Sequence, residues 1–564
     1  MRMAPISEEK LKDAFMFASM FFGVVFVIGI VDNDAWFLMN SGRYVELFGI
    51  PHVEPFTVHE NLHFVMQQWL FAVGLWKIYT LFGINGIIAF SVIAGIVLIY
   101  SIYRLNYLVS EGNKDTACFL TFLTGILICL LFVRQRPQVV SSLIFIWEIY
   151  FLERYGSEDI KKTAVVFWIF SVLLINVHAA MWPMLFVFLL PYLLESIIGE
   201  KTASFAMKTT GWYWKDLAIL AVIIFVAGFI NPYGTDAMMY TIHSYGYDEI
   251  NLVVGEMKAL GIRSFYGIPI AIMFILAIGY SRIKTPLHYI LLSAGTALMA
   301  FMALRSVFLF LLFGCMSFAY FMRNWRGVEI RLDNSREAIR KRTLLLLMMG
   351  IMDVYVIHKR WDMFSGMFAL SCIKDIALLF LMLFMALIFV FSILYMKNNR
   401  SMCTVLLGFS LVGFIFVPSF FELISKPVVP KGLEASAKVI LEQGNTEDIV
   451  LWTGYNDGSY MEFNGVRCYL DARAEIFMPD INGKKNILNE YILLLAGNID
   501  YRDFIKRYNF THFLTTTKDP LYESLKHDDN YILIFDSLKE GIDDSIGEDD
   551  PYAEYYRVYA VKEQ

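Results

Sequence analysis

The stretch VDNDAWFLMNSGRYVELFGIPHVEPFT, residues 31–57, begins where an apolar run at 14–31 ends, and that run is long enough to cross a membrane. Two acids, Asp32 and Asp34, stand at the end of the run, and Trp36 follows them. Charged side chains at membrane depth are costly, and they are typical of functional sites or of ion pairs. The stretch therefore predicts a first outer loop that places acidic groups at a membrane surface.

The composition is that of a polytopic α-helical membrane protein. Of 564 residues, 57% are hydrophobic and only 18% are charged, and the mean hydropathy is +0.55. A helical crossing of the bilayer core needs about 20 mostly apolar residues. Apolar runs predict about thirteen crossings, at 14–31, 86–103, 116–133, 138–153, 163–180, 183–198, 216–230, 267–281, 286–304, 306–322, 343–357, 375–396 and 401–420. The net charge of −6 gives no indication of nucleic-acid binding.

The segment 64–83 decides the topology, because a crossing there would move every later loop to the other side. It carries Gln67, Gln68 and Lys77 within an apolar pattern. If it stays at the outer surface, the cytoplasmic segments hold 22 Lys and Arg and the outer loops hold 10. Lys and Arg accumulate in short cytoplasmic loops. We therefore expect an amphipathic interfacial helix at 64–83, a cytoplasmic N-terminus and an extracytoplasmic C-terminal part.

The apolar runs end at residue 420, which predicts a transmembrane domain at 1–420 and a separate α/β domain at 421–564. The first outer loop and its interfacial helices occupy 32–85. Strand-like stretches at 449–454, 466–471, 511–517, 531–536 and 556–562, with a helix at 433–442, favour a small sheet layered with helices. The segments YNDGSYMEF (455–463) and YLDARAEIF (469–477) are expected either to face the membrane-side cleft or to form a structural pair of Asp471 with Arg473.

Three arginines stand at outer helix ends in this topology: Arg134, Arg136 and Arg305. One interpretation is that they reach headgroups and pair with Asp32 and Asp34 to fix helix packing. The other is that they line an outer cleft with these acids. Such a cleft suits a phosphate-bearing lipid and a hydroxyl to be activated, since guanidinium groups bind phosphate and a carboxylate can act as a general base.

Two further outer residues are candidates for the same cleft. His178 sits at an outer helix end, where it is either a hydrogen-bonded packing residue or a catalytic one. Glu256, followed by Lys258, lies in a long outer loop and either faces the cleft or forms a solvated pair. The six cysteines are scattered, mostly within apolar runs, and indicate neither a disulfide framework nor a metal site.

Together these features resemble the GT-C superfamily of membrane glycosyltransferases. More closely, they resemble a group of bacterial GT-C-like proteins whose first loop reads roughly D-x-D-x-W-W-H-L-x-x-G-R and then G-x-P-x-x-D-P-F-S. The corresponding residues here are Asp32, Asp34, Trp36, Phe37, Leu38, Gly42, Arg43, Gly49, Pro51, Glu54, Pro55, Phe56 and Thr57. Other similar pieces are Arg136-Pro137-Gln138, Asn176 with His178, the NPYG at 231–234, and Asp471 with Arg473.

This resemblance implies a sugar transfer from a polyprenyl-phosphate donor to an extracytoplasmic glycan, lipid or protein. It implies that Asp34 orients or deprotonates the acceptor, and that Asp32 supports it or shares a divalent metal, Mg²⁺ or Mn²⁺, with it. The arginines would neutralise the leaving phosphate. The chain departs from the family pattern at Leu38, where the family has a histidine, and at Gln68, which often is acidic.

A second function stays open beside the first. The same envelope location, a multi-pass protein of a bacterial plasma membrane, suits a non-enzymatic transporter or a scaffold for glycan assembly. A transporter typically shows an internal repeat with broken helices in corresponding positions, and no such pairing is evident in the sequence.

Overall fold

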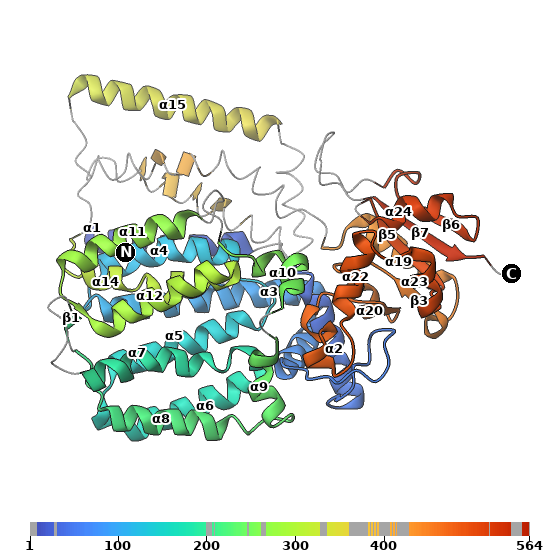
Figure 1. The fold of residues 1–564 in the computed structure, drawn as a ribbon. Coiled ribbons are helices and arrows are strands. Elements are labelled where there is room, and N and C mark those ends of the chain that lie inside the picture. The colour runs from blue at the N-terminus through green and yellow to red at the C-terminus, as the bar shows by residue number, and fades with distance from the viewer. Residues whose placement is uncertain are drawn as a thin grey trace.

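The structure is a computed structural model. It describes residues 8–27, 31–198, 206–207, 209–244, 247–260, 267–326, 335–359, 428–517, 519–542 and 555–562, with scattered positions between 379 and 413. A bundle of long helices forms most of the molecule, and a smaller α/β domain lies against one end of it (Figure 1). The predicted crossings at 375–396 and 401–420 lie for the most part outside the described residues.

The bundle contains several apolar helices of membrane length. Its elements are α1 (Glu8–Met20), α3 (Trp69–Val109), α4 (Lys114–Leu131), α5 (Gln138–Arg154), α6 (Ile160–Val177), α7 (Met184–Ile198), α8 (Trp214–Ala227), α11 (Gly267–Arg282), α12 (Leu287–Met302), α13 (Val307–Leu309), α14 (Ser317–Phe321) and α15 (Arg336–Lys359). A 3-10 turn, η1 (Phe21–Val27), continues α1. Among the described residues, five helical stretches are long and apolar enough to cross a membrane: Trp69–Val109, Lys114–Leu131, Ser157–Val177, Ala179–Ile198 and Leu304–Phe321. The protein is therefore a multi-pass membrane protein.

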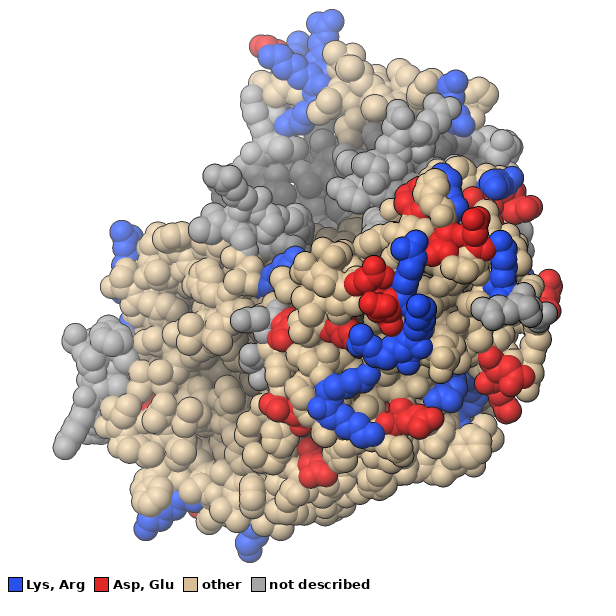
Figure 2. Space-filling model, turned by 45° about the vertical axis from the view of Figure 1, so that its right-hand side comes forward, with Lys and Arg blue, Asp and Glu red and all other residues tan. Residues whose placement is uncertain are grey.

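The surface of the bundle is apolar, as a lipid-facing surface must be. Val165 on α6 and Val222 on α8 are each 60% exposed, and Phe225 is 51% exposed. Figure 2 shows the charged residues gathered over the C-terminal domain, whereas the visible face of the bundle carries few of them. Large apolar side chains exposed in this number indicate lipid rather than water as the neighbouring solvent.

The predicted interfacial helix and the crossing that follows it join at Gly83. The helix begins at Trp69 rather than at residue 64 and runs to Val109 as α3, with a break at Gly83 (φ 60°, ψ −155°). This backbone conformation is open to glycine but strained for other residues. Gly83 thus separates two helical segments and lets the second begin in a new direction.

An outer helix, α2 (Asp34–Phe48), packs against the first part of α3. A Cβ atom built on Gly42 would lie 2.1 Å from the carbonyl oxygen of Ala72. Only a glycine permits this approach of the two backbones. Gly42 therefore sets how closely α2 packs against α3, and α2 begins with Asp34.

The C-terminal domain is a mixed five-stranded sheet with helices. Its strands are β3 (Val450–Trp452), β4 (Arg467–Cys468), β5 (His512–Thr516), β6 (Tyr531–Asp536) and β7 (Tyr556–Val561), in the order β4-β3-β5-β7-β6. β3 pairs in parallel with β4 and β5, and β7 pairs antiparallel with β5 and β6. The helices are α19 (Lys431–Glu442), α20 (Gly458–Phe463), α21 (Pro479–Asn482), α22 (Ile487–Leu495), α23 (Tyr501–Tyr508) and α24 (Leu521–Ser524). Every predicted strand overlaps one of these five.

The first outer loop is bound to the edge of this sheet beside β4. The amide of Val58 donates to the carbonyl of Cys468 at 2.9 Å, and His59 Nε2 lies 2.8 Å from the carbonyl of Tyr469. Arg467 donates to the carbonyl of Thr57 at 2.9 Å and 3.0 Å. Thr57 thus forms an isolated parallel bridge with Cys468, and residues 57–59 lie along the edge of β4.

A buried ion cluster fixes the same interface. The Arg473 guanidinium, with its side chain 6% exposed, lies 2.9 Å from Glu54 Oε1 and also pairs with Asp471. Glu462 lies 3.7 Å away, and burial raises the pKa of its carboxyl well above the usual range. Glu54 belongs to the first outer loop and Arg473 to the C-terminal domain. The expected structural pair of Asp471 and Arg473 thus extends to a residue more than 400 positions earlier in the chain.

Replacing Arg473 with methionine should strongly destabilise the protein. Removing one partner of a buried ion pair typically costs about 3–5 kcal/mol, because the remaining charges are left without compensation. We expect the melting temperature of the purified protein, followed by intrinsic fluorescence, to fall by several degrees or more. Lys438→Ala is the control, since its pair with Glu434 is exposed and should contribute little. Equal melting temperatures for the two variants would contradict the role of this cluster.

Candidate functional site

The acids that open the first outer loop sit at the start of α2. Asp34 is the first residue of the helix, and its amide donates to Asp32 Oδ1 at 3.0 Å. The amide of Ala35 donates to the carbonyl of Asp32 at 3.0 Å, which completes the turn into the helix. A carboxylate in the first helical turn is stabilised by the helix dipole. The sequence D-x-D thus places both side chains at one helix end.

Arg136 joins these acids from the loop between α4 and α5. Its guanidinium lies 3.1 Å from Asp32, 2.9 Å from Asp34 and 3.0 Å from Glu256. Glu256 comes from η5 (Gly255–Met257), so three separate segments meet at one cation. Two neighbouring acids therefore compete with Asp34 for the same positive charge.

Burial raises the pKa of Asp34 to about 7, although Arg136 acts to lower it and the nearby Asp32 and Glu256 add to the rise. The side chain keeps 24% exposure, so water or a substrate can reach it. A carboxyl group that titrates near neutral pH is suited to general acid and base catalysis. Asp34 therefore has both the access and the proton affinity of a base.

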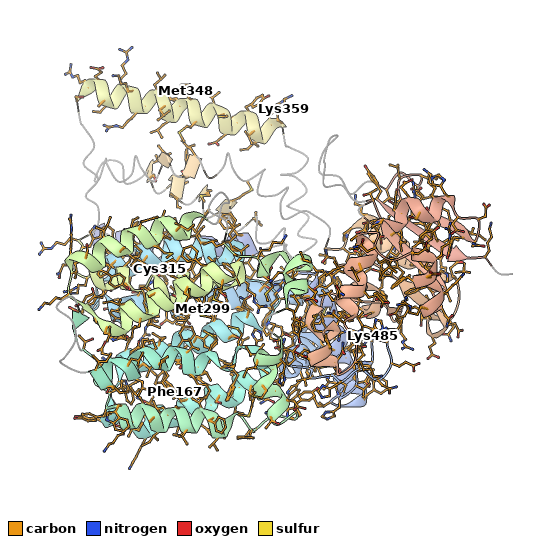
Figure 3. The ribbon with its side chains drawn as sticks, in the orientation of Figure 1. Phe167, Met299, Cys315, Met348, Lys359 and Lys485 are labelled. Atoms are coloured by element: carbon orange, nitrogen blue, oxygen red, sulfur yellow. The ribbon has the colours of Figure 1, made fainter. Side chains whose placement is uncertain are left out.

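A cavity of about 860 Å³ opens beside Asp34, between the bundle and the C-terminal domain. Its polar wall includes Asp34, Gln67, Gln68, Arg136, His178, Glu256, Arg305, Tyr455 and Glu475. Its apolar wall carries several methionines, Met66, Met181, Met184, Met257, Met299 and Met302. Met299 comes from α12 and is labelled in the bundle in Figure 3. The cavity thus combines charged side chains with flexible apolar ones.

The two other predicted arginines have different surroundings. Arg305, in η6 (Leu304–Ser306), lines the cavity. Arg134 is not among the lining residues, and it donates to the carbonyls of Leu130 at 2.8 Å and Val133 at 2.7 Å. These carbonyls lie at the C-terminal end of α4, where a cation is favourable. The structure therefore brings Arg136 and Arg305 to one cavity and leaves Arg134 at a helix end.

His178 follows α6 and lies on the cavity wall. Its Nδ1 is 2.8 Å from Ser141 Oγ, and its amide donates to the carbonyl of Leu174. Leu38 and Gln68, the two departures from the family pattern, also line the cavity. The replaced positions therefore belong to the same wall as Asp34, where they change the polar groups that a ligand meets.

Several cavity residues were missed from the sequence because they come from the C-terminal domain. Tyr455 and Glu475 both line the cavity, and Gln67 Nε2 lies 3.4 Å from Glu475 Oε1. The available signal was the pair of segments YNDGSYMEF and YLDARAEIF, which contain these two residues. The YLDARAEIF segment holds the interface through Arg473 and also reaches the cavity through Glu475.

Asp32 and Asp34 are the acids from which the sequence predicts a shared divalent metal. Within the described ranges, no group of three or more His, Cys, Asp or Glu side chains is arranged to hold a metal ion. Asp32 and Asp34 both face the Arg136 guanidinium. The two acids that were expected to share a metal therefore share an ion pair with one arginine.

No family model matches the chain, and no curated protein matches its sequence. Its fold is similar to solved GT-C glycosyltransferases. ArnT from Cupriavidus metallidurans bound to undecaprenyl phosphate is 10% identical, with a TM-score of 0.51 over 98% of both chains. The apo form of ArnT gives the same score and identity over 97% of both chains. The archaeal oligosaccharyltransferase AglB from Archaeoglobus fulgidus, in complex with an inhibitory peptide and a dolichol-phosphate, is 8% identical, with a TM-score of 0.54 over 90% of this chain and 69% of that one.

The raised pKa of Asp34 predicts a carboxyl group that loses its proton near neutral pH. A pKa raised to about 7 leaves the group mostly protonated at about pH 6 and mostly ionised at about pH 8. Infrared difference spectra between these pH values should show the loss of a protonated carboxyl band. The band should be absent from Asp34→Asn, and its persistence in that variant would assign the titration to another acid.

Proposed function

We propose that the chain is a membrane glycosyltransferase that moves a sugar from a polyprenyl-phosphate donor to an extracytoplasmic glycan, lipid or protein acceptor. The observation that carries this proposal is the single cavity that holds Asp34, a carboxyl with a pKa near neutrality, together with Arg305. A base can accept a proton from the acceptor, and a cation in the same cavity can stabilise the charge on a leaving phosphate. Together they suit the transfer of a group away from phosphate. The similarity in fold to ArnT and AglB supports the same class of reaction.

The reaction is a displacement at the anomeric carbon of the donor. Ionised Asp34 takes the proton of the acceptor hydroxyl as the acceptor oxygen forms its bond to that carbon. The bond between the carbon and the phosphate oxygen breaks, and its electron pair leaves with the polyprenyl phosphate. Arg305 offsets the negative charge that grows on the leaving group, because guanidinium donates strong hydrogen bonds to phosphate oxygens.

The walls of the cavity support separate places for the two substrates. The methionine-rich wall suits an isoprenoid chain, since Met side chains are flexible and adapt to apolar ligands. Tyr455 and Glu475 come from the C-terminal domain and suit the polar acceptor. The excess of Lys and Arg in the predicted inner loops supports a cytoplasmic N-terminus and an extracytoplasmic site.

Asp34→Asn should reduce transfer by about 100-fold to 10,000-fold, the usual contribution of a general base. The side chain keeps its shape, so the variant should stay folded. Transfer is measured with purified protein and labelled polyprenyl-phosphate sugars, and folding is followed by melting temperature. Asp236→Asn is the matched control, because Asp236 is an exposed outer acid paired with His63 and does not line the cavity. Full activity of Asp34→Asn would remove the base from the mechanism and favour the non-enzymatic alternative.

Arg305→Gln should weaken the binding of polyprenyl phosphate roughly 10-fold to 100-fold, since a hydrogen bond to a charged group contributes about 1.5–3 kcal/mol. Arg134→Gln should leave binding unchanged because Arg134 faces main-chain carbonyls. Binding is measured by displacement of a labelled polyprenyl phosphate from protein in nanodiscs. Equal losses in both variants would show that the arginines act on the fold and not on the phosphate.

A further inference from the structure

Three carboxylates surround the Arg136 guanidinium, each at a different nitrogen. Asp34 Oδ2 lies 2.9 Å from Nε, Asp32 Oδ1 lies 3.1 Å from Nη2, and Glu256 Oε2 lies 3.0 Å from Nη1. The acids therefore contact three different nitrogen atoms of one planar cation. Their side chains range from 13% exposed for Asp32 to 54% exposed for Glu256, so water reaches the group, unlike the protein core.

A divalent metal cannot share this arrangement with Arg136. Mg²⁺ requires oxygen ligands at about 2.0–2.1 Å around one point. The guanidinium already binds an oxygen of each of the three carboxylates, through a different nitrogen atom in each case. It also places a permanent positive charge where the metal would have to stand, and an arginine stays protonated at any physiological pH.

We propose that Arg136 is the resident cation of the site and performs the positioning that a divalent metal would otherwise provide, so that the protein binds no metal between Asp32 and Asp34. This inference rests on the proposed function, because it assigns Arg136 a role in positioning Asp34 as the general base of sugar transfer. Arg136 is a positioning residue: it holds Asp34 at the cavity and ties α2 to η5. The phosphate of the donor is left to Arg305.

Asp32 acts through the same network. Its Oδ1 accepts hydrogen bonds from the Asp34 amide at 3.0 Å and from Arg136 Nη2 at 3.1 Å. Both bonds hold the start of α2, and neither leaves that oxygen directed at a ligand. In the D-x-D sequence, Asp32 therefore accepts a hydrogen bond from the start of α2 and binds Arg136, and Asp34 binds the same arginine. These contacts do not require a metal.

The proposal makes a direct prediction for the unaltered protein. Electron paramagnetic resonance of added Mn²⁺ should show no saturable site, and EDTA should not change the melting temperature. A saturable Mn²⁺ site in the unaltered protein that is lost in Asp34→Asn would overturn the proposal. These readouts need no turnover, so they stay separate from the test of sugar transfer.

Removing the cation should create a metal site. In Arg136→Ala three carboxylates remain without compensation, and they can approach a hydrated ion, since Mg²⁺ usually keeps several waters and needs few carboxylates. We expect a lower melting temperature than that of the unaltered protein, partly restored by Mn²⁺, together with a saturable Mn²⁺ signal. Arg136→Lys keeps a cation and should show no such signal. A folded Arg136→Ala that gains no Mn²⁺ site would count against the proposal.

Two controls separate positioning from general stability. Arg134→Ala also removes a partly buried guanidinium from the same loop, yet Arg134 donates to main-chain carbonyls rather than to carboxylates, so Mn²⁺ should not restore its melting temperature. Adding Glu256→Gln to Arg136→Ala should weaken the Mn²⁺ signal. If Mn²⁺ restored both arginine variants equally, the effect would be nonspecific and the proposal would fail.

Discussion

A buried ion cluster around Arg473 holds the two parts of the molecule together. Arg473 pairs with Glu54 from the first outer loop and with Asp471 from the C-terminal domain. Charges out of water are stable only while each keeps its partners, which fixes loop and domain in one arrangement. The cavity depends on this arrangement because both parts supply its walls, with Asp34 from one and Glu475 from the other.

The two arginine clusters of the protein share a composition but differ in burial. Arg473 and Arg136 each lie among three acids, yet their side chains are 6% and 26% exposed. The interaction of charges weakens as water approaches, so the attraction between opposite charges is stronger in the deeper cluster. The shallower cluster leaves Asp34 accessible and able to change its charge. Burial thus distinguishes the arginine that joins the two parts of the molecule from the arginine at the cavity.

Local patterns in the sequence predicted part of this arrangement. Apolar runs gave helices of membrane length, and short β-branched stretches gave all five strands, because both signals depend on neighbouring residues. Arg134 and Arg136 could not be separated, since the direction of each side chain follows from the folded turn between α4 and α5. Tyr455 and Glu475 could not be predicted as cavity residues for a related reason. Long-range packing decides which loop of the C-terminal domain meets the membrane part.

Leu38 stands where the similar GT-C-like sequence pattern has a histidine, and its position affects the surroundings of Asp34. Residues four apart lie on the same face of a helix, and Leu38 follows Asp34 by four positions on α2. Both line the cavity, and Leu38 is fully buried. An apolar neighbour withholds solvation from the carboxylate, which agrees with burial as the main cause of its raised pKa. Because Leu38 offers no hydrogen-bonding group, the Asp34 carboxylate is oriented by its ion pair with Arg136.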